Sequence, residues 1–238
     1  MKPRYCVHFS LVLLAFSPLA WAAHPSNELR DSVAIRTERL LDDLASDDVR
    51  NRWYAAYRLG QIGPEAKSPS VVGALTRILE NRTDHEYVRD MAAWSLGRIQ
   101  ASTPEAISTL ETALQSTLPS VRRAAAEALG AIGPPAKTAV SSLTEVLGDK
   151  DPVARVRAAE AIWKIALSAE AKTALLGALG ASEREAFEAA LALGRLRVHS
   201  DDVVEALTAV LKHRSGDVRR AAKRALRQIE TTHATDNR

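Results

Sequence analysis

Residues 121–133 read Val-Arg-Arg-Ala-Ala-Ala-Glu-Ala-Leu-Gly-Ala-Ile-Gly, and this stretch decides the fold because versions of it recur on both sides. Its fullest form is Arg-x-x-Ala-Ala-x-x-Leu-Gly-x-Ile. Six copies are anchored by the following residues: Leu59, Leu96, Leu129, Ile162, Leu193 and Leu226. Successive anchors are 37, 33, 33, 31 and 33 residues apart. This period is typical of stacked repeat units rather than of one closed core.

Each unit is predicted to contain two helices. The apolar residues of the third copy recur at the three- and four-residue spacing of one helical face: Val121, Ala125, Leu129 and Ile132. The segment before it, 106–114, has the same rhythm and predicts a partner helix. No strand-like alternation competes with this pattern. The sequence therefore predicts an all-α, right-handed α-solenoid of about six antiparallel helix pairs, in which each unit contacts only its neighbours.

Glycine and short polar residues indicate helix contacts and helix ends. Glycine within the second helices, at Gly60, Gly97, Gly130 and Gly194, costs about 1 kcal/mol relative to alanine and so predicts close helix contact. Gly63-Pro64 and Gly133-Pro134 are expected to end two of these helices. Side-chain caps are expected where the second helices start: Asp47 or Asp48, Asp84, Ser120, Asp151, Ser182 and Asp217.

The first 22 residues have the features of a signal peptide. Lys2 and Arg4 precede an apolar stretch over 7–19, and Ala20-Trp21-Ala22 offers small residues at the two positions that a signal peptidase requires. Cleavage is expected after Ala22, with export, most simply to a bacterial periplasm; a retained anchor is the alternative. The stretch is shorter than the roughly 20 residues of a membrane span. We expect a solenoid over 23–230 and a disordered tail over 231–238.

Composition excludes several chemistries for the mature chain. The protein has 238 residues with 32 basic and 29 acidic side chains, and removal of Lys2 and Arg4 leaves a nearly balanced charge. The alkaline isoelectric point therefore gives no argument for nucleic-acid binding. Cys6 is the one cysteine and precedes the cleavage site, so no disulfide, catalytic cysteine or cysteine metal site is expected.

In its repeated residues the chain resembles the HEAT-repeat family, in particular the phycobiliprotein-lyase HEAT-like repeats with the hallmark Val-Arg-x-x-Ala-Ala-x-x-Leu-Gly-x-Ile-Gly. Residues 121–133 match this hallmark closely, and the resemblance covers about 30–230. It implies a protein-binding surface, with the second helices lining the concave side. It also implies a ladder of arginines between units. Since Ala186 replaces the arginine of the fifth unit, this ladder is expected to have a gap there.

The positions that do not repeat are the expected contact surface. Two residues before the anchors the chain has Tyr57, Trp94, Glu127, Glu160, Leu191 and Arg224. Six residues before, it has Trp53, Asp90, Arg123, Val156, Phe187 and Arg220. We expect a partner-binding patch formed by Trp53, Tyr57, Arg58, Trp94 and Arg98, because aromatic and arginine side chains dominate binding hot spots. The alternative is that these rings only seal the N-terminal end of the stack.

The last helix carries a basic face formed by Arg220, Lys223, Arg224 and Arg227. It is interpreted either as an anion-binding surface or as the polar cap that a terminal repeat needs for solubility, and the cap is the more typical case. No transmembrane segment, nucleic-acid partner or oligomeric state is predicted.

No catalytic motif is present, so the chain is expected not to be an enzyme and to need no cofactor and no metal. His85-Glu86 is a single His-Glu pair, whereas the helical-repeat hydroxylases of the deoxyhypusine type use several pairs to hold two irons. The function expected is a non-catalytic scaffold that binds a protein or peptide. The alternative is an enzyme or enzyme subunit related to the bilin lyases or to these hydroxylases.

Overall fold

The computed structural model describes the backbone of residues 25–236 and the side chains of residue 33 and residues 35–231. Within this range the chain forms twelve α-helices, two short 3₁₀ segments and no strand. The helices pair in chain order: α1 (Pro25–Leu44) with α2 (Val49–Ile62), α3 (Pro69–Glu80) with α4 (Glu86–Arg98), α5 (Pro104–Ala113) with α6 (Pro119–Ile132), α7 (Val140–Val146) with α8 (Pro152–Ala166), α9 (Ala169–Leu179) with α10 (Glu183–Leu196), and α11 (Asp201–Val210) with α12 (Gly216–Asp236). The 3₁₀ segments η2 (Gly63–Ala66) and η3 (Pro134–Ala139) precede α3 and α7. The prediction of an all-α solenoid is confirmed.

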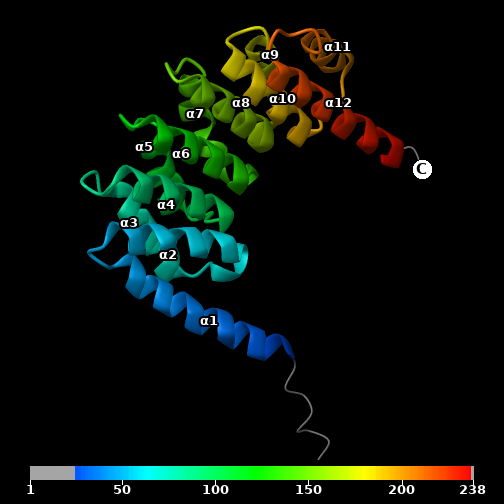
Figure 1. Ribbon diagram of the computed structural model, residues 1–238. Coiled ribbons are helices and arrows are strands. Elements are labelled where there is room, and N and C mark those ends of the chain that lie inside the picture. The colour runs from blue at the N-terminus through cyan, green and yellow to red at the C-terminus, as the bar shows by residue number, and fades with distance from the viewer. Residues whose placement is uncertain (1–24, 237–238) are drawn as a thin grey trace, which may run out of the picture.

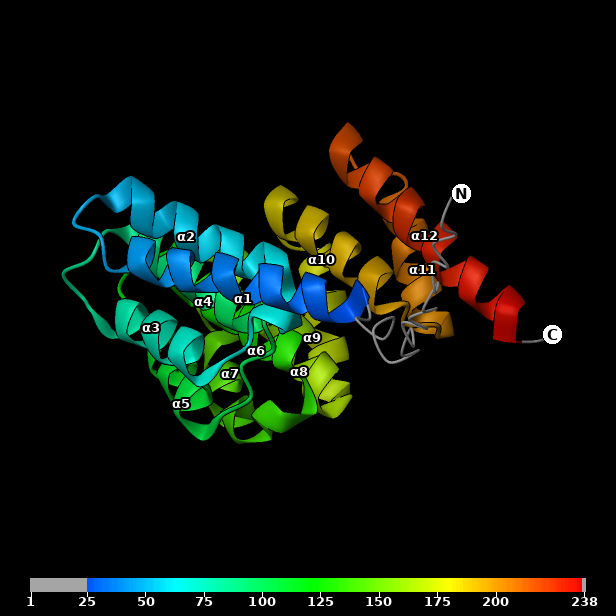
Figure 2. The same cartoon turned by 90° about the horizontal axis from the view of Figure 1, so that it is seen from below.

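The six pairs stack along an arc (Figure 1). The second helices, α2 to α12 in even numbers, lie along the inner side and pack on one another more extensively than the first helices do. This difference in packing bends the stack. At the N-terminal end α1 lies against both α2 and α3, and seen from below it runs beside α2, with α12 at the other end (Figure 2).

The interior glycines lie where neighbouring second helices approach most closely. A Cβ on Gly97 would lie 2.5 Å from the Cα of Ala128, and one on Gly130 would lie 2.9 Å from the Cα of Ala161. A Cβ on Gly194 would lie 2.9 Å from the Cα of Ala225, whereas one on Gly60 would meet side-chain atoms of Trp94 and Ser95. The prediction of contacts too close for a methyl group is confirmed at all four positions.

The helix ends agree with most of the expected caps. Gly63 and Gly133 end α2 and α6 with φ of 73° and 75°, a conformation that glycine adopts without strain. Asp48, Asp151 and Ser182 cap α2, α8 and α10 through their side chains.

Three expected caps are wrong. Asp84 is held by Arg52, so His85 caps α4 and its Nδ1 accepts the amide hydrogen of Tyr87 at 3.3 Å. Leu118 occupies the cap position of α6, while the hydroxyl of Ser120 donates to Glu86 instead. Asp217 lies inside α12, which begins at Gly216.

Arginines near the start of the second helices bind the following unit. Arg52 pairs with Asp84 at 2.6 Å, Arg122 with Asp149 at 2.6 Å, and Arg155 with Glu185 at 2.5 Å; we call these three pairs the arginine ladder. Each guanidinium also donates to a backbone carbonyl of the turn before its own helix. Ala186 is fully buried and carries no charge, so the expected gap at this position is confirmed.

The buried apolar side chains form two clusters, which meet near α8. One extends from Leu40 to Ala171 and the other from Val156 to Ile229. Trp163 stands where four of the other units have glycine, and it packs against both clusters. The contact between α8 and α10 is the least extensive between successive second helices.

The last helix continues past residue 230, the expected end of the solenoid. It ends at Asp236, so the backbone of residues 231–236, which the sequence predicts as a tail, is helical. No glycine or proline follows Gly216 to end the helix. The predicted signal segment, 1–22, lies outside the described residues.

Candidate functional site

Three aromatic rings form a continuous stack across the first two units. Trp53 and Tyr57 are one helical turn apart on α2, with ring centroids 5.6 Å apart and planes 1° from parallel. Trp94 of α4 continues the stack, 6.0 Å from the ring of Tyr57 and at an angle of 17°. The structure therefore brings together the three rings that the sequence placed on neighbouring units.

The two arginines predicted for this patch behave differently. Arg98 lies over the ring of Trp94, 5.7 Å from its centroid, and extends the stack. Arg58 does not join it. Its guanidinium lies 5.8 Å from the ring centroid of Tyr54 and donates to the hydroxyl of that tyrosine at 3.2 Å. Sequence reasoning missed Tyr54, although its position four residues before Arg58 on the same helix is the signal that identifies the pair.

The stack is anchored on one side and open on the other. Trp53 is 37% exposed, while Tyr57 and Trp94 are half-buried. The ring of Trp94 packs against Gly60, and the neighbouring Ser95 donates to the carbonyl of Ala56 at 2.6 Å. We call the group formed by Trp53, Tyr57, Trp94 and Arg98 the aromatic surface.

The equivalent positions of the fourth unit do not belong to an exposed surface. Val156 and Glu160 are 2% and 5% exposed, so the expectation that these variable positions form contact surface is wrong for this unit. Val156 belongs to the second apolar cluster, against which Phe187 and Leu191 of the next unit also pack. Apolar packing therefore accounts for Val156, Phe187 and Leu191.

Ion pairs replace aromatic rings from α6 to α10. Arg157 contacts three carboxylates, those of Glu127 at 3.4 Å, Glu160 at 3.2 Å and Glu188 at 3.3 Å. Glu160 also pairs with Arg195 at 2.6 Å and Lys164 at 2.9 Å. Burial alone would raise the pKa of Glu160, but the hydrogen bond and charge of Arg195, with those of Lys164, lower it to about 2. We call these residues the charged network; opposite charges at variable positions of successive units were its signal in the sequence.

Asp90 lies on α4 where the aromatic surface gives way to charged residues. Burial, the charges of Glu127 and Glu86, and only partial compensation by Arg123 raise the pKa of this carboxyl to about 6. The surroundings of Asp90 therefore oppose its ionisation, whereas those of Glu160 favour ionisation.

The four basic residues predicted on the last helix are all exposed on α12. Arg220, Lys223, Arg224 and Arg227 line a shallow hollow of about 480 Å³ with Gln228 and Thr231. Arg220 pairs with Asp217 one turn earlier. This arrangement fits both the anion-binding and the polar-cap interpretation.

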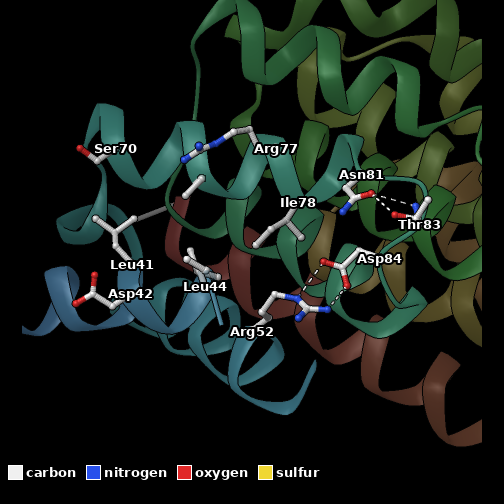
Figure 3. Close-up of a pocket in the computed structure, with 12 residues that line it drawn as sticks. Leu41, Asp42, Leu44, Arg52, Ser70, Arg77, Ile78, Asn81, Thr83 and Asp84 are labelled. Carbon is white, nitrogen blue, oxygen red and sulfur yellow. Dashed lines mark hydrogen bonds and ion pairs between the residues drawn. The ribbon is translucent and has the colours of Figure 1, made fainter. Parts of the chain in front are cut away.

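A cleft of about 840 Å³ lies between the first two units (Figure 3). Leu41 and Leu44 of α1 and Arg77 of α3 line it, together with the ion pair of Arg52 and Asp84. Arg52 and Asp84 neutralise each other, and the cleft is also lined by one further acidic and one further basic residue, Asp42 and Arg77.

Within the described part of the chain, no three His, Cys, Asp or Glu side chains come together as a metal site. His85 is exposed at its cap position. No helix in the same range is long and apolar enough to cross a membrane.

Comparison with known families identifies the class of protein. A model of HEAT repeats matches residues 37–130 and 112–194, which together exceed half of the chain. The chain therefore belongs to the HEAT-repeat family. None of the curated proteins compared with it matches.

Several solved structures are similar in fold. YibA of Escherichia coli is 18% identical over 88% of this chain and 79% of its own, with a TM-score of 0.56. An engineered protein is 25% identical over 82% of this chain and 97% of its own, with a TM-score of 0.49. The complex of CpcE and CpcF of phycocyanin lyase from Nostoc sp. PCC7120 is 20% identical over 81% of this chain and 94% of its own, with a TM-score of 0.46.

Proposed function

We propose that this chain is an exported, non-catalytic scaffold that binds a partner protein or peptide through the aromatic surface on the inner side of its second helices. The observation that carries this proposal is the continuous stack of three rings, partly open to solvent, between α2 and α4. Aromatic and arginine side chains supply most of the energy in protein interfaces. Rings held in a fixed orientation also lose little conformational entropy when a partner binds.

Two further observations support the proposal. Because α1 packs on α2 and α3, that helix already covers the N-terminal end of the stack, and the rings are not needed to seal it. Export is supported by the charged start, the apolar stretch and the small residues before position 23. Mass spectrometry of the mature protein tests export, and a chain that begins at Ala23 is the expected result.

The experiment compares capture of a partner by the tagged mature protein and by single variants. Trp53→Ala and Tyr57→Ala are each expected to weaken binding roughly thirtyfold, the effect of losing a hot-spot side chain of about 2 kcal/mol. Tyr87→Ala is the matched control, because this ring is 63% exposed but lies outside the stack. Equal capture by all three variants, with circular dichroism unchanged, would contradict the proposal.

A further inference from the structure

Arg89 occupies the ladder position of the second unit but has no carboxylate partner. Its side chain is 7% exposed, and its Nε donates to the carbonyl of Leu79 at 3.2 Å. Among the described residues no acidic group lies within ion-pair distance of its guanidinium, and the Nη groups have no hydrogen bond. Arg89 lines a cavity, so these Nη groups are not sealed in the core, but the positive charge has no acidic partner there.

The missing partner can be located by comparison between units. Asp84 precedes the anchor Leu96 by 12 residues, and Asp149 precedes Ile162 by 13. In the third unit, the residues 12 and 13 positions before the anchor Leu129 are Thr117 and Ser116, and neither carries a charge. The turn that supplies a carboxylate to Arg52 and Arg122 therefore supplies only hydroxyl groups to the second unit.

A cavity occupies the space beside Arg89. Its volume is about 320 Å³, and it is bounded by the end of α3 and by α5 with the turn that follows. Glu80 also lies in its wall and adds one negative charge, and the hydroxyl of Thr109 holds that carboxylate at 2.9 Å. Arg82 adds a second positive charge to the wall. Burial and then the charge of Arg82 lower the pKa of Arg89, and the charge of Asp84 only partly opposes them.

We propose that this cavity binds a carboxylate supplied from outside the chain, held by the Nη groups of Arg89 and the hydroxyl of Thr117. Arg52 and Arg122 each hold a carboxylate with two donor nitrogens, Nε and Nη2. In Arg89 the Nε donates to Leu79, so the two Nη groups are the pair of donors that remains for a carboxylate. The cleft one unit earlier displays the completed arrangement, with Asp84 seated on Arg52 (Figure 3). The ligand is either a free carboxylate ion or an acidic side chain of a peptide. This site is separate from the aromatic surface and does not depend on the proposed function.

The direct test follows the Nε–H signal of Arg89 by NMR in the full mature protein. The probes are sodium acetate and a peptide with blocked ends and one Asp, with sodium chloride at equal ionic strength as the reference. A saturable shift of this signal with acetate or peptide, absent with chloride, is expected. The tighter of the two probes identifies the source of the carboxylate. Arg89→Gln is expected to remove the binding measured by calorimetry, at least tenfold in affinity.

A second variant keeps the proposal testable if Arg89→Gln does not fold. Thr117→Asp supplies the missing carboxylate within the chain, so it is expected to raise the Tm by about 2–4 °C and to abolish the response to acetate. Thr173→Asp adds the same charge on α9, away from the cavity, and should keep the acetate response. An Arg89 signal that neither probe shifts, or a Thr117→Asp protein that still responds to acetate, would overturn the proposal.

Discussion

Single glycines set the distance between the second helices. At Gly97 and Gly130 the next helix comes so close that a methyl group would meet backbone atoms of Ala128 and Ala161. Backbone atoms cannot move away as the end of a flexible side chain can. Glycine destabilises the helix itself relative to alanine, but at these positions it allows the close packing of neighbouring helices.

Substitution of glycine by alanine distinguishes the effect on helix packing from the effect on the stability of the helix itself. Gly97→Ala is expected to destabilise the protein by about 1–3 kcal/mol, because the added carbon must push α4 and α6 apart. Gly73→Ala on α3 is the matched control: nothing lies within 4 Å of its added carbon, so it should stabilise the protein by up to about 1 kcal/mol. Urea unfolding measures both. Equal signs for the two changes would contradict this account of helix contact.

Asp90 makes stability depend on pH in an unusual direction. Its pKa is about 6 in the folded protein against 3.8 for an ordinary aspartate, so the folded state binds the proton more tightly. This contribution to stability is present below about pH 4 and is lost as the pH rises through 6. Glu160 behaves in the opposite way, because its pKa is lowered from 4.5 to about 2. Its contribution to stability is present above pH 4.5 and is lost as the pH falls toward 2.

Replacing Asp90 by Asn, which mimics the protonated carboxyl, tests this assignment. Asp90→Asn is expected to raise the free energy of unfolding above pH 6 by up to about 3 kcal/mol and to leave it unchanged below pH 4. Urea unfolding across this pH range measures the difference. A difference that is constant with pH would show that the ionisation of Asp90 does not couple to folding.

At the scale of elements, the contact between α8 and α10 differs from the others. Trp163 replaces glycine there, and the two apolar clusters meet at this place. In repeat proteins stability is approximately the sum of units and of contacts between neighbours. A weaker contact therefore divides the stack into parts that open with different free energies.

Hydrogen exchange in two core variants tests this division. Leu193→Ala removes a fully buried side chain of the second cluster, at a cost of about 2–5 kcal/mol, and should lower exchange protection in α9 to α12 far more than in α2 to α6. Leu96→Ala, equally buried in the first cluster, is the matched control and should give the reverse pattern. Uniform loss of protection in both variants would mean that the solenoid unfolds as one unit.

At the scale of the whole molecule, the repeat allowed the fold to be predicted. The anchors, the interior glycines and the glycine caps obey local rules that the sequence displays directly. The expected caps at Asp84 and Ser120 failed because residues of other units, Arg52 and Glu86, bind them. Such competition depends on contacts between units, which spacing along the chain does not reveal.

The candidate site was predictable in part for the same reason. Comparison of equivalent positions in successive repeats predicted that Trp53, Tyr57 and Trp94 lie on one surface, and in the structure their rings are stacked. The sequence did not show that Arg58 turns to Tyr54, because two aromatic neighbours lay within its reach. It also did not show that Val156 and Glu160 are buried, since Val156 packs in the second apolar cluster and Glu160 is held by ion pairs with residues of its own and the next unit.

The central claim is that the aromatic surface on α2 and α4 binds the partner. Hydrogen–deuterium exchange of the mature protein, with and without the captured partner, tests it most directly. The account predicts that binding slows exchange in α2 and α4 and leaves α9, α11 and α12 unchanged. Slower exchange confined to α12 or to the outer helices, with α2 and α4 unaffected, would contradict it.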